Sequence, residues 1–177
     1  MKKYEFTGET KEIRLLFRTT TLHRIRATVA FGIVEVGDLG GWIEKEENLS
    51  HEGKAWVCGD AEVWGNAEVW GNAKVCGDAK VCGDAEVCGD AKVFSASHVL
   101  VIGAIGSRND FTTFYRDKDN EITVKCGCFL GKIDRFLEKV TQTHGDSKYA
   151  LVYRAAVEVA KLQIDLSGEA PKDADEE

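Results

Sequence analysis

The sequence predicts a mainly β protein whose centre is a parallel, triangular β-helix of three to four coils. Six hexapeptides of the form Val-[Cys/Trp]-Gly-[Asp/Asn]-Ala-[Glu/Lys] follow one another without insertion over residues 57–92. A short fixed period of this kind is typical of β-helices. Val and Ala share one parity and are expected to point inward, while their neighbours point outward. The Gly-Asp or Gly-Asn step supplies a corner, because glycine tolerates positive φ.

The rest of the chain divides around this repeat. We expect an N-terminal β cap of two or three strands over residues 1–38 and the β-helix over residues 39–104. A C-terminal α+β module follows over residues 105–166, with a hairpin across Asp117–Asn120 and helices over Ile133–His144 and from about Asp146 to Ile164. Gly145 is the expected C-cap of the first helix. Residues 167–177 are acidic and are expected to form a disordered tail.

The repeat resembles the hexapeptide-repeat family of acyltransferases and γ-type carbonic anhydrases, which implies a left-handed β-helix. The whole chain also resembles a group of small phage and prophage hexapeptide-repeat proteins. The segments that carry this second resemblance are residues 22–27, 37–50, 105–113, 126–128 and 143–146, together with the repeat.

Composition and charge limit the partners and the cellular compartment that the chain is expected to have. The net charge is −7 over 177 residues, and the basic residues form no long patch, which argues against a duplex nucleic-acid partner. No apolar run reaches the roughly 18 residues of a membrane span, and the first residues lack a signal-peptide core. We therefore expect a cytoplasmic protein without membrane contact, whose six cysteines remain thiols.

The chemistry of the repeat family is not expected here. Acyl transfer uses a histidine base, yet the chain has no histidine between His51 and His98. His51 is expected to be a buried core residue and His98 to point outward. A zinc triad would need a third histidine nearby, and Cys126 with Cys128 alone makes no zinc site, so these cysteines are interpreted as small core residues. We therefore predict a non-enzymatic protein with no catalytic residue, no metal and no cofactor.

A ligand site is predicted just after the repeat. Glycines, a hydroxyl, an amide and an arginine gather at residues 103–110, where backbone N–H groups and Arg108 could bind a phosphate or carboxylate. The alternative is an ordinary turn in which Arg108 pairs with a local acid such as Asp110. The predicted ligand-binding residues are Ser107, Arg108, Asn109, Thr112, Thr113 and Tyr115.

The resemblance to hexapeptide-repeat proteins, which are usually trimers, implies a homotrimer as the expected assembly. Outward residues would sort onto three faces, and a lysine-bearing apolar face would meet an acidic face of the next subunit. The alternative is that terminal segments of the same chain cover the apolar face. The predicted interface residues are Trp56, Lys74, Lys92 and Phe94 on one face, and Glu68, Glu86 and Trp70 on the other.

The resemblance to phage proteins implies a role as an antagonist of host defence. The favoured hypothesis is sequestration of a small anionic nucleotide. The alternatives are a protein–protein inhibitor of a host factor and a hexapeptide-repeat acyltransferase.

Overall fold

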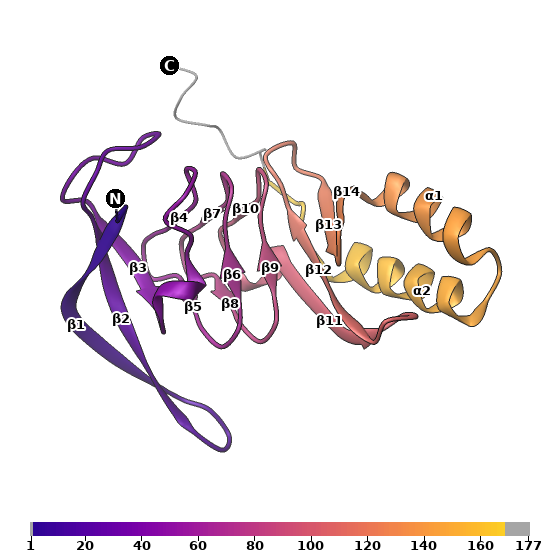
Figure 1. Cartoon of the computed structure of the whole chain (residues 1–177), viewed down its shortest axis with the longest axis horizontal. Coiled ribbons are helices and arrows are strands. Elements are labelled where there is room, and N and C mark those ends of the chain that lie inside the picture. Colours follow the sequence, from indigo (N-terminus) through magenta and orange to yellow (C-terminus); the bar gives the residue numbers. More distant parts are fainter. Residues whose placement is uncertain (1, 169–177) are drawn as a thin grey trace.

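The computed structural model describes residues 2–168. The chain runs from an N-terminal hairpin through the repeat to a C-terminal module of strands and helices (Figure 1). The N-terminal part comprises β1 (Tyr4–Arg14), β2 (Thr19–Ala27), β3 (Leu39–Ile43) and a short 3₁₀ helix (Glu46–Asn48). β1 and β2 are antiparallel, and β3 pairs antiparallel with β2.

The repeat contributes seven strands of two residues each. They are β4 (Trp56–Val57), β5 (Glu62–Val63), β6 (Glu68–Val69), β7 (Lys74–Val75), β8 (Lys80–Val81), β9 (Glu86–Val87) and β10 (Lys92–Val93). The valine of each strand and the alanine before it are fully buried or nearly so, as their shared parity predicts. These small side chains form one hydrophobic core that Tyr4, Ile25 and Tyr115 complete from outside the repeat.

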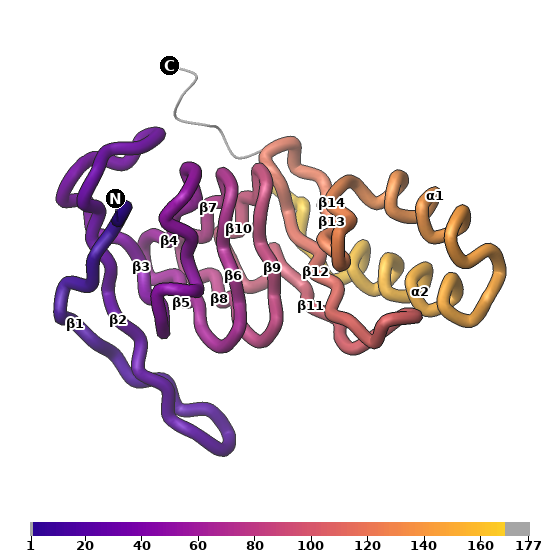
Figure 2. The backbone as a smooth tube through the Cα atoms, in the orientation of Figure 1, coloured from indigo at the N-terminus to yellow at the C-terminus, as the bar shows by residue number. Residues whose placement is uncertain are grey.

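Residues eighteen apart pair in parallel within the repeat. Val57 pairs with Val75, which in turn pairs with Val93, and Val69 pairs with Val87. Backbone bonds such as Glu62 N to Ala79 O, at 2.9 Å, join neighbouring layers. Figure 2 shows these layers following one another between the two ends of the molecule.

The C-terminal part holds a second sheet and two helices. A 3₁₀ helix (Ala96–His98) leads into β11 (Val99–Ile105), β12 (Asp110–Arg116), β13 (Ile122–Cys126) and β14 (Phe129–Lys132). Next come α1 (Ile133–His144) and α2 (Lys148–Gln163). Gly145 caps α1, and both predicted helices are confirmed. They pack on this sheet around a separate core of Phe114, Val124, Phe136 and Val157.

The predicted fold class is wrong. We expected a mainly β, left-handed parallel β-helix, but the described residues form a mixed strand-and-helix fold with four separate small sheets and two helices. The sheet orders are β1-β2-β3-β5-β8, β10-β7-β4, β11-β12-β13-β14 and β6-β9.

Two physical reasons account for this difference. The Gly corners limit each repeat strand to two residues, so the repeat supplies short strands to three different sheets. The largest of these sheets also contains the antiparallel N-terminal strands. In addition, residues 99–104 belong to β11 and pair with β12, so they extend the C-terminal sheet and not the central segment. The predicted disordered tail lies outside the described residues except for Ser167 and Gly168.

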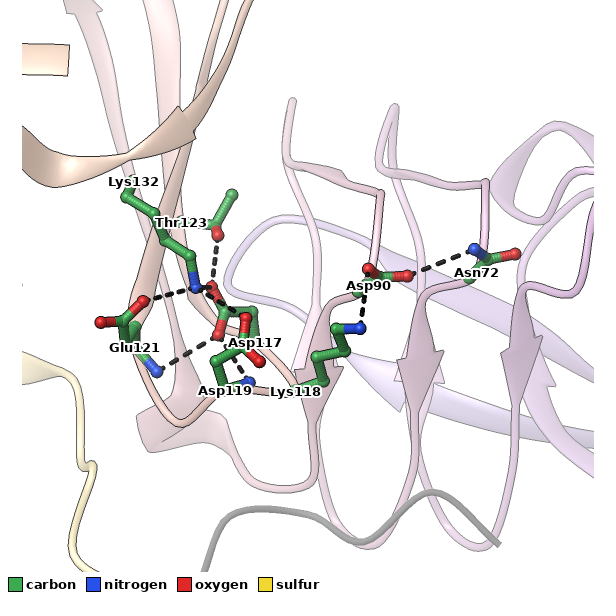
Figure 3. Close-up of polar contacts among 8 residues, drawn as sticks. All are labelled: Asn72, Asp90, Asp117, Lys118, Asp119, Glu121, Thr123 and Lys132. Carbon is green, nitrogen blue, oxygen red and sulfur yellow. Dashed lines mark hydrogen bonds and ion pairs between the residues drawn. The ribbon is translucent and has the colours of Figure 1, made fainter. Parts of the chain in front are cut away.

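A buried carboxylate joins the C-terminal sheet to the repeat. Asp117 pairs with Ala91 of the last repeat, and Lys118 N donates to Asp90 O at 3.1 Å. The Asp117 carboxylate accepts bonds from Thr123 Oγ1 at 2.5 Å and from Lys132 Nζ at 2.6 Å (Figure 3). Burial alone would lower the pKa of Lys132, but its bonds to Asp117 and Glu121 offset burial and raise that pKa above its usual range.

On the repeat side, Asp90 extends this junction. Its carboxylate accepts a bond from Asn72 Nδ2 at 3.2 Å and lies 3.7 Å from Lys118 Nζ (Figure 3). Because Asn72 and Asp90 stand eighteen residues apart, this contact continues the layer-to-layer bonding outward through side chains.

We expect Asp117→Asn to lower the free energy of unfolding by about 2–3 kcal/mol, because it removes a buried charge from hydrogen-bonded donors. Urea denaturation measures this loss. Asp119→Asn is the matched control, since Asp119 is 58% exposed and its ion pair with Lys132 is a surface one. The control should change stability by less than about 0.5 kcal/mol. Equal effects of the two variants would contradict a central role for Asp117.

Candidate functional site

A cavity of about 400 Å³, here called the C-terminal pocket, lies between the two sheet turns and the two helices of the C-terminal part. The β11–β12 turn contributes Ser107, Arg108 and Asp110, and the β13–β14 turn contributes Cys126 to Cys128. The helices and β14 supply the other wall, which includes Phe129, Phe136, Lys139, Thr143, His144 and Tyr153. Cationic groups and aromatic rings therefore share one cavity.

The β11–β12 turn is shaped by residues with positive φ. Ile105 pairs with Asp110, so the four residues between them form the turn. Gly106 has φ of 73° and Asn109 has φ of 49°, values that glycine and asparagine tolerate best. A Cβ at Gly106 would lie 1.9 Å from the Tyr153 hydroxyl oxygen. Glycine is therefore required here for two reasons, the backbone angle and the close approach of Tyr153.

Tyr153 is a neutral hydroxyl donor in this pocket. Burial is the main cause that raises its pKa to about 12, and the charge and hydrogen bonding of the neighbouring Cys126 thiol contribute to the same shift. The Thr112 hydroxyl also donates to Cys126 Sγ, at 3.2 Å. The His144 ring stacks on Tyr153 with centroids 5.8 Å apart, and Phe136 meets Tyr153 edge-on at 5.6 Å. These contacts fix the aromatic wall before any ligand enters.

The six predicted ligand residues separate onto different surfaces. Ser107 and Arg108 line the C-terminal pocket, whereas Asn109 lies in the turn that carries them. Thr112 is fully buried and donates to Cys126 Sγ, so its side chain contacts a residue of the pocket wall from the inside of the protein. Thr113 and Tyr115 have the opposite parity on β12 and face the repeat: Thr113 Oγ1 accepts a bond from Glu86 N at 3.1 Å, and the Tyr115 hydroxyl lies 3.4 Å from Cys88 Sγ.

Sequence reasoning missed the opposite wall of this pocket. Lys139 and His144 lie on α1 and Tyr153 on α2, far along the chain from the glycine-rich turn. The segment 143–146 was noted only as part of a resemblance. The one sequence feature that pointed to this wall was the position of residues 143–146 at the end of an amphipathic helix with a glycine cap. Polar side chains gather at such helix ends.

The predicted interface residues are partly covered by the chain itself. Trp56 is buried, with Phe31 packed edge-on at 5.4 Å and Tyr4 at 6.5 Å. Lys92 is also buried. On the acidic face, Glu86 forms an ion pair with Lys125 at 2.7 Å, while Glu68 is exposed and Trp70 is half-buried. The trimer stays a prediction, and the N-terminal segment already covers part of the apolar face.

The histidines next to the repeat are engaged in structural contacts. His51 Nδ1 accepts a bond from Lys3 N at 3.1 Å, and its ring stacks on Tyr4. His98 was expected to point outward but is buried, and its Nδ1 accepts a bond from Phe94 N at 3.1 Å. Burial and the nearby Arg116 guanidinium lower the pKa of His98, so its ring is held neutral.

The cysteines also differ from expectation. Cys58 and Cys76 form a disulfide, with Cα atoms 4.5 Å apart, so the prediction that all six remain thiols is wrong for this pair. They occupy the same hexapeptide position eighteen residues apart, and parallel pairing brings them within bonding reach. Cys126 is half-buried but Cys128 is exposed, so Cys128 is not the core residue that was expected.

Within residues 2–168, no three His, Cys, Asp or Glu side chains gather in an arrangement that could bind a metal ion. Over the same residues, no helix has both the length and the apolar character needed to cross a membrane. No protein-family model matches the chain, and no curated protein matches its sequence.

We expect Gly106→Ala to destabilise the protein by about 1–3 kcal/mol and to displace Tyr153, because both backbone strain and a steric clash result. Thermal unfolding and near-ultraviolet circular dichroism measure the two effects. Gly83→Ala is the matched control: Gly83 has φ of 68°, but a Cβ there would meet nothing within 4 Å. Gly106→Ala should therefore cost more than Gly83→Ala, and the reverse order would refute the contact with Tyr153.

Proposed function

We propose that this protein is a non-enzymatic binding protein that takes a small anionic ligand of the nucleotide class into the C-terminal pocket. The observation that carries the proposal is that Arg108 and Lys139 line the same cavity as three aromatic rings. A cavity of about 400 Å³ falls within the usual range of small-molecule sites. The chemical class of the ligand follows from these two kinds of group, the cationic side chains and the aromatic rings.

The anionic part of the ligand is assigned to Arg108. A guanidinium presents a planar fork of donors that matches phosphate oxygens, and such charge-assisted bonds are among the stronger ones in proteins. Arg108 is exposed on its turn, and Ser107 beside it lines the same pocket. Lys139 adds a second positive charge from the α1 side. Asp110, the acidic residue of this turn, accepts a bond from Phe111 N at 2.8 Å.

The base of the ligand is assigned to the aromatic wall. Every nucleobase offers a π-face for stacking, worth roughly 1–3 kcal/mol per base on an aromatic side chain. Phe129, Phe136 and Tyr153 line the pocket, and their mutual ring contacts hold them in place. The neutral Tyr153 hydroxyl adds a polar group to this wall. Such a pocket would bind and sequester the ligand without converting it into a product.

The biological setting is part of the proposal and rests on the resemblance to phage proteins. A phage-encoded nucleotide sponge would act in the host cytoplasm, where it would lower the concentration of a defence signal. A homotrimer would place three such pockets on one particle.

Isothermal titration with the mono-, di- and triphosphates of adenosine and guanosine tests the ligand class. We expect at least one of these nucleotides to bind, and Arg108→Gln to weaken that binding about tenfold or more, as loss of one charge-assisted bond predicts. Arg135→Gln is the matched control, since Arg135 is exposed on α1 and does not line the pocket. Binding by none of the six nucleotides, or equal affinity in both variants, would overturn the proposal.

A second candidate function, inhibition of a host protein, is favoured by the tip of the β1–β2 hairpin. Figure 1 shows this hairpin reaching away from the rest of the molecule. At its tip Leu16 is 87% exposed and Phe17 is 93% exposed, and Arg14 and Arg18 flank them. Adjacent large apolar side chains on a projecting tip are typical of a surface that another protein covers.

Photo-crosslinking in cells that contain the protein tests this alternative. A photoreactive residue at position 17 should give one discrete adduct, and Leu16→Ser should reduce its yield severalfold. The same residue at Thr21, which is exposed on the same hairpin away from the tip, is the control. Adducts of equal yield and pattern from both positions would exclude the tip as a specific binding surface.

A further inference from the structure

Two exposed surfaces of this chain have opposite charge, and each has an apolar centre. The first is the tip of the β1–β2 hairpin, where Leu16 is 87% exposed and Phe17 is 93% exposed. Arg14 and Arg18 flank them and are also exposed. Within the part of the chain that the structure describes, neither guanidinium takes part in an ion pair. The hairpin tip therefore presents two apolar side chains between two positive charges.

The conformation of the hairpin tip is fixed before any partner binds. β1 and β2 stay paired up to Arg14 and Thr19, and Leu15 N donates to Arg18 O at 2.8 Å. Figure 1 shows the hairpin reaching away from the repeat. A short closed turn of this kind requires little ordering when it binds.

The second surface is a hollow of about 620 Å³ formed by the 3₁₀ helix after β3, the residues that follow it and β6. We call it the acidic groove. It is lined by three exposed carboxylates, those of Glu46, Glu47 and Glu68. Its apolar lining includes Val69 and the half-buried Trp70. An aromatic ring therefore lies among negative charges.

Two of the three carboxylates are not balanced within the chain. Glu46 forms an ion pair with Lys2, and its carboxylate lies 3.8 Å from His51 Nε2. Burial is the main cause that lowers the pKa of His51, so its ring adds no positive charge at neutral pH. Glu47 and Glu68 form no ion pair with any described residue. The acidic groove therefore keeps a negative charge.

The acidic groove is also held in place by the fold. Asn48 Nδ2 donates to Ala67 O at 2.8 Å, and Leu49 pairs in parallel with Val69. Trp70 packs against the core of the repeat. The groove can therefore receive a partner without rearranging its own backbone.

The hairpin tip and the acidic groove are complementary. Guanidinium groups form strong, often bidentate bonds with carboxylates, and large apolar side chains bury well against a tryptophan. The regions that carry the two surfaces also differ in charge. Residues 1–36 contain seven basic and four acidic side chains, whereas residues 37–98 contain five and twelve. Both surfaces are exposed, so the tip does not occupy the groove of its own chain.

We propose that the hairpin tip of one copy of this protein binds in the acidic groove of a second copy. Phe17 packs against Trp70, and the two arginines of the tip pair with Glu47 and Glu68. Because different surfaces meet, the contact is heterologous, and copies joined in this way form a ring where the rotation between them closes. The contact does not depend on a ligand in the C-terminal pocket.

This contact gives two surfaces a partner other than the one considered above. In the predicted trimer, Glu68 and Trp70 would meet a lysine-bearing face, whereas here they meet the hairpin of the next copy. The hairpin tip is also the surface of the second candidate function. One tip cannot bind a host protein and a second copy at once, so the two partners would compete.

Sedimentation of the purified protein tests the contact, because no host factor is present. The tip variant carries Phe17→Ser and Arg18→Ser, and the groove variant carries Glu47→Lys and Glu68→Lys. We expect the wild type to associate at about 100 µM and each variant to associate at least tenfold more weakly. All four positions are exposed, and thermal unfolding checks that each variant is folded.

An equimolar mixture of the two variants is the sharper test. The tip variant keeps an intact groove, and the groove variant keeps an intact tip, so one native contact remains possible between them. We expect a 1:1 dimer that does not grow further. A contact between two identical surfaces would give no such rescue.

The matched control carries Arg135→Ser and Glu138→Lys, two changes at exposed positions of α1, and should associate as the wild type does. A wild type that stays monomeric at about 100 µM would overturn the proposal and leave the tip to a host protein. Association of either variant at the wild-type level, or a mixture without the 1:1 dimer, would also overturn it.

Discussion

The close stacking of glycine corners is the constraint on which the molecule depends. A Cβ at Gly53 would lie 2.5 Å from the carbonyl oxygen of Gly71, and a Cβ at Gly77 would lie 2.4 Å from that of Phe94. These corners also have positive φ, so any larger residue there is strained twice. Tight corners let alanine and valine alone fill the interior. They also place every eighteenth residue directly beside the next.

The spacing of eighteen residues determines which side chains meet on the outside of the repeat. It brings Cys58 to Cys76, Asn72 to Asp90, and Trp56 to Lys74 and then Lys92. Each row of residues eighteen apart has its own chemical composition, because the outward residue changes from one hexapeptide to the next. A cavity of about 540 Å³ lies where the row that contains Trp56 and the disulfide meets the loop that carries Phe31.

The two ends of the repeat are closed in different ways. At the N-terminal end Tyr4 inserts into the repeat core, and its hydroxyl donates to Leu49 O at 2.8 Å. At the C-terminal end Tyr115 inserts into the same core, while Asp117 fixes the adjoining turn through charged and neutral donors. The C-terminal pocket lies beyond this junction, on a sheet and helices with their own core.

In the repeat, the hexapeptide pattern alone predicted the burial of Val and Ala and the glycine corners. Farther along the chain, helical periodicity and a following glycine predicted both helices and the Gly145 cap. These features follow from local periodicity and backbone preference, which a single sequence displays directly. The fold class was wrong because sheet membership depends on which distant strands pair, as when β3 joins β5 and β11 joins β12.

For the candidate site, the sequence by itself determined Ser107 and Arg108, since a glycine-rich turn exposes its polar side chains. Only the tertiary structure decided that Lys139, His144 and Tyr153 complete the pocket, and that Thr113 and Tyr115 face the repeat instead. The physical reason is that the orientation of a strand fixes which parity faces which layer. No local pattern around β12 shows which of its two faces the repeat covers and which the helices cover.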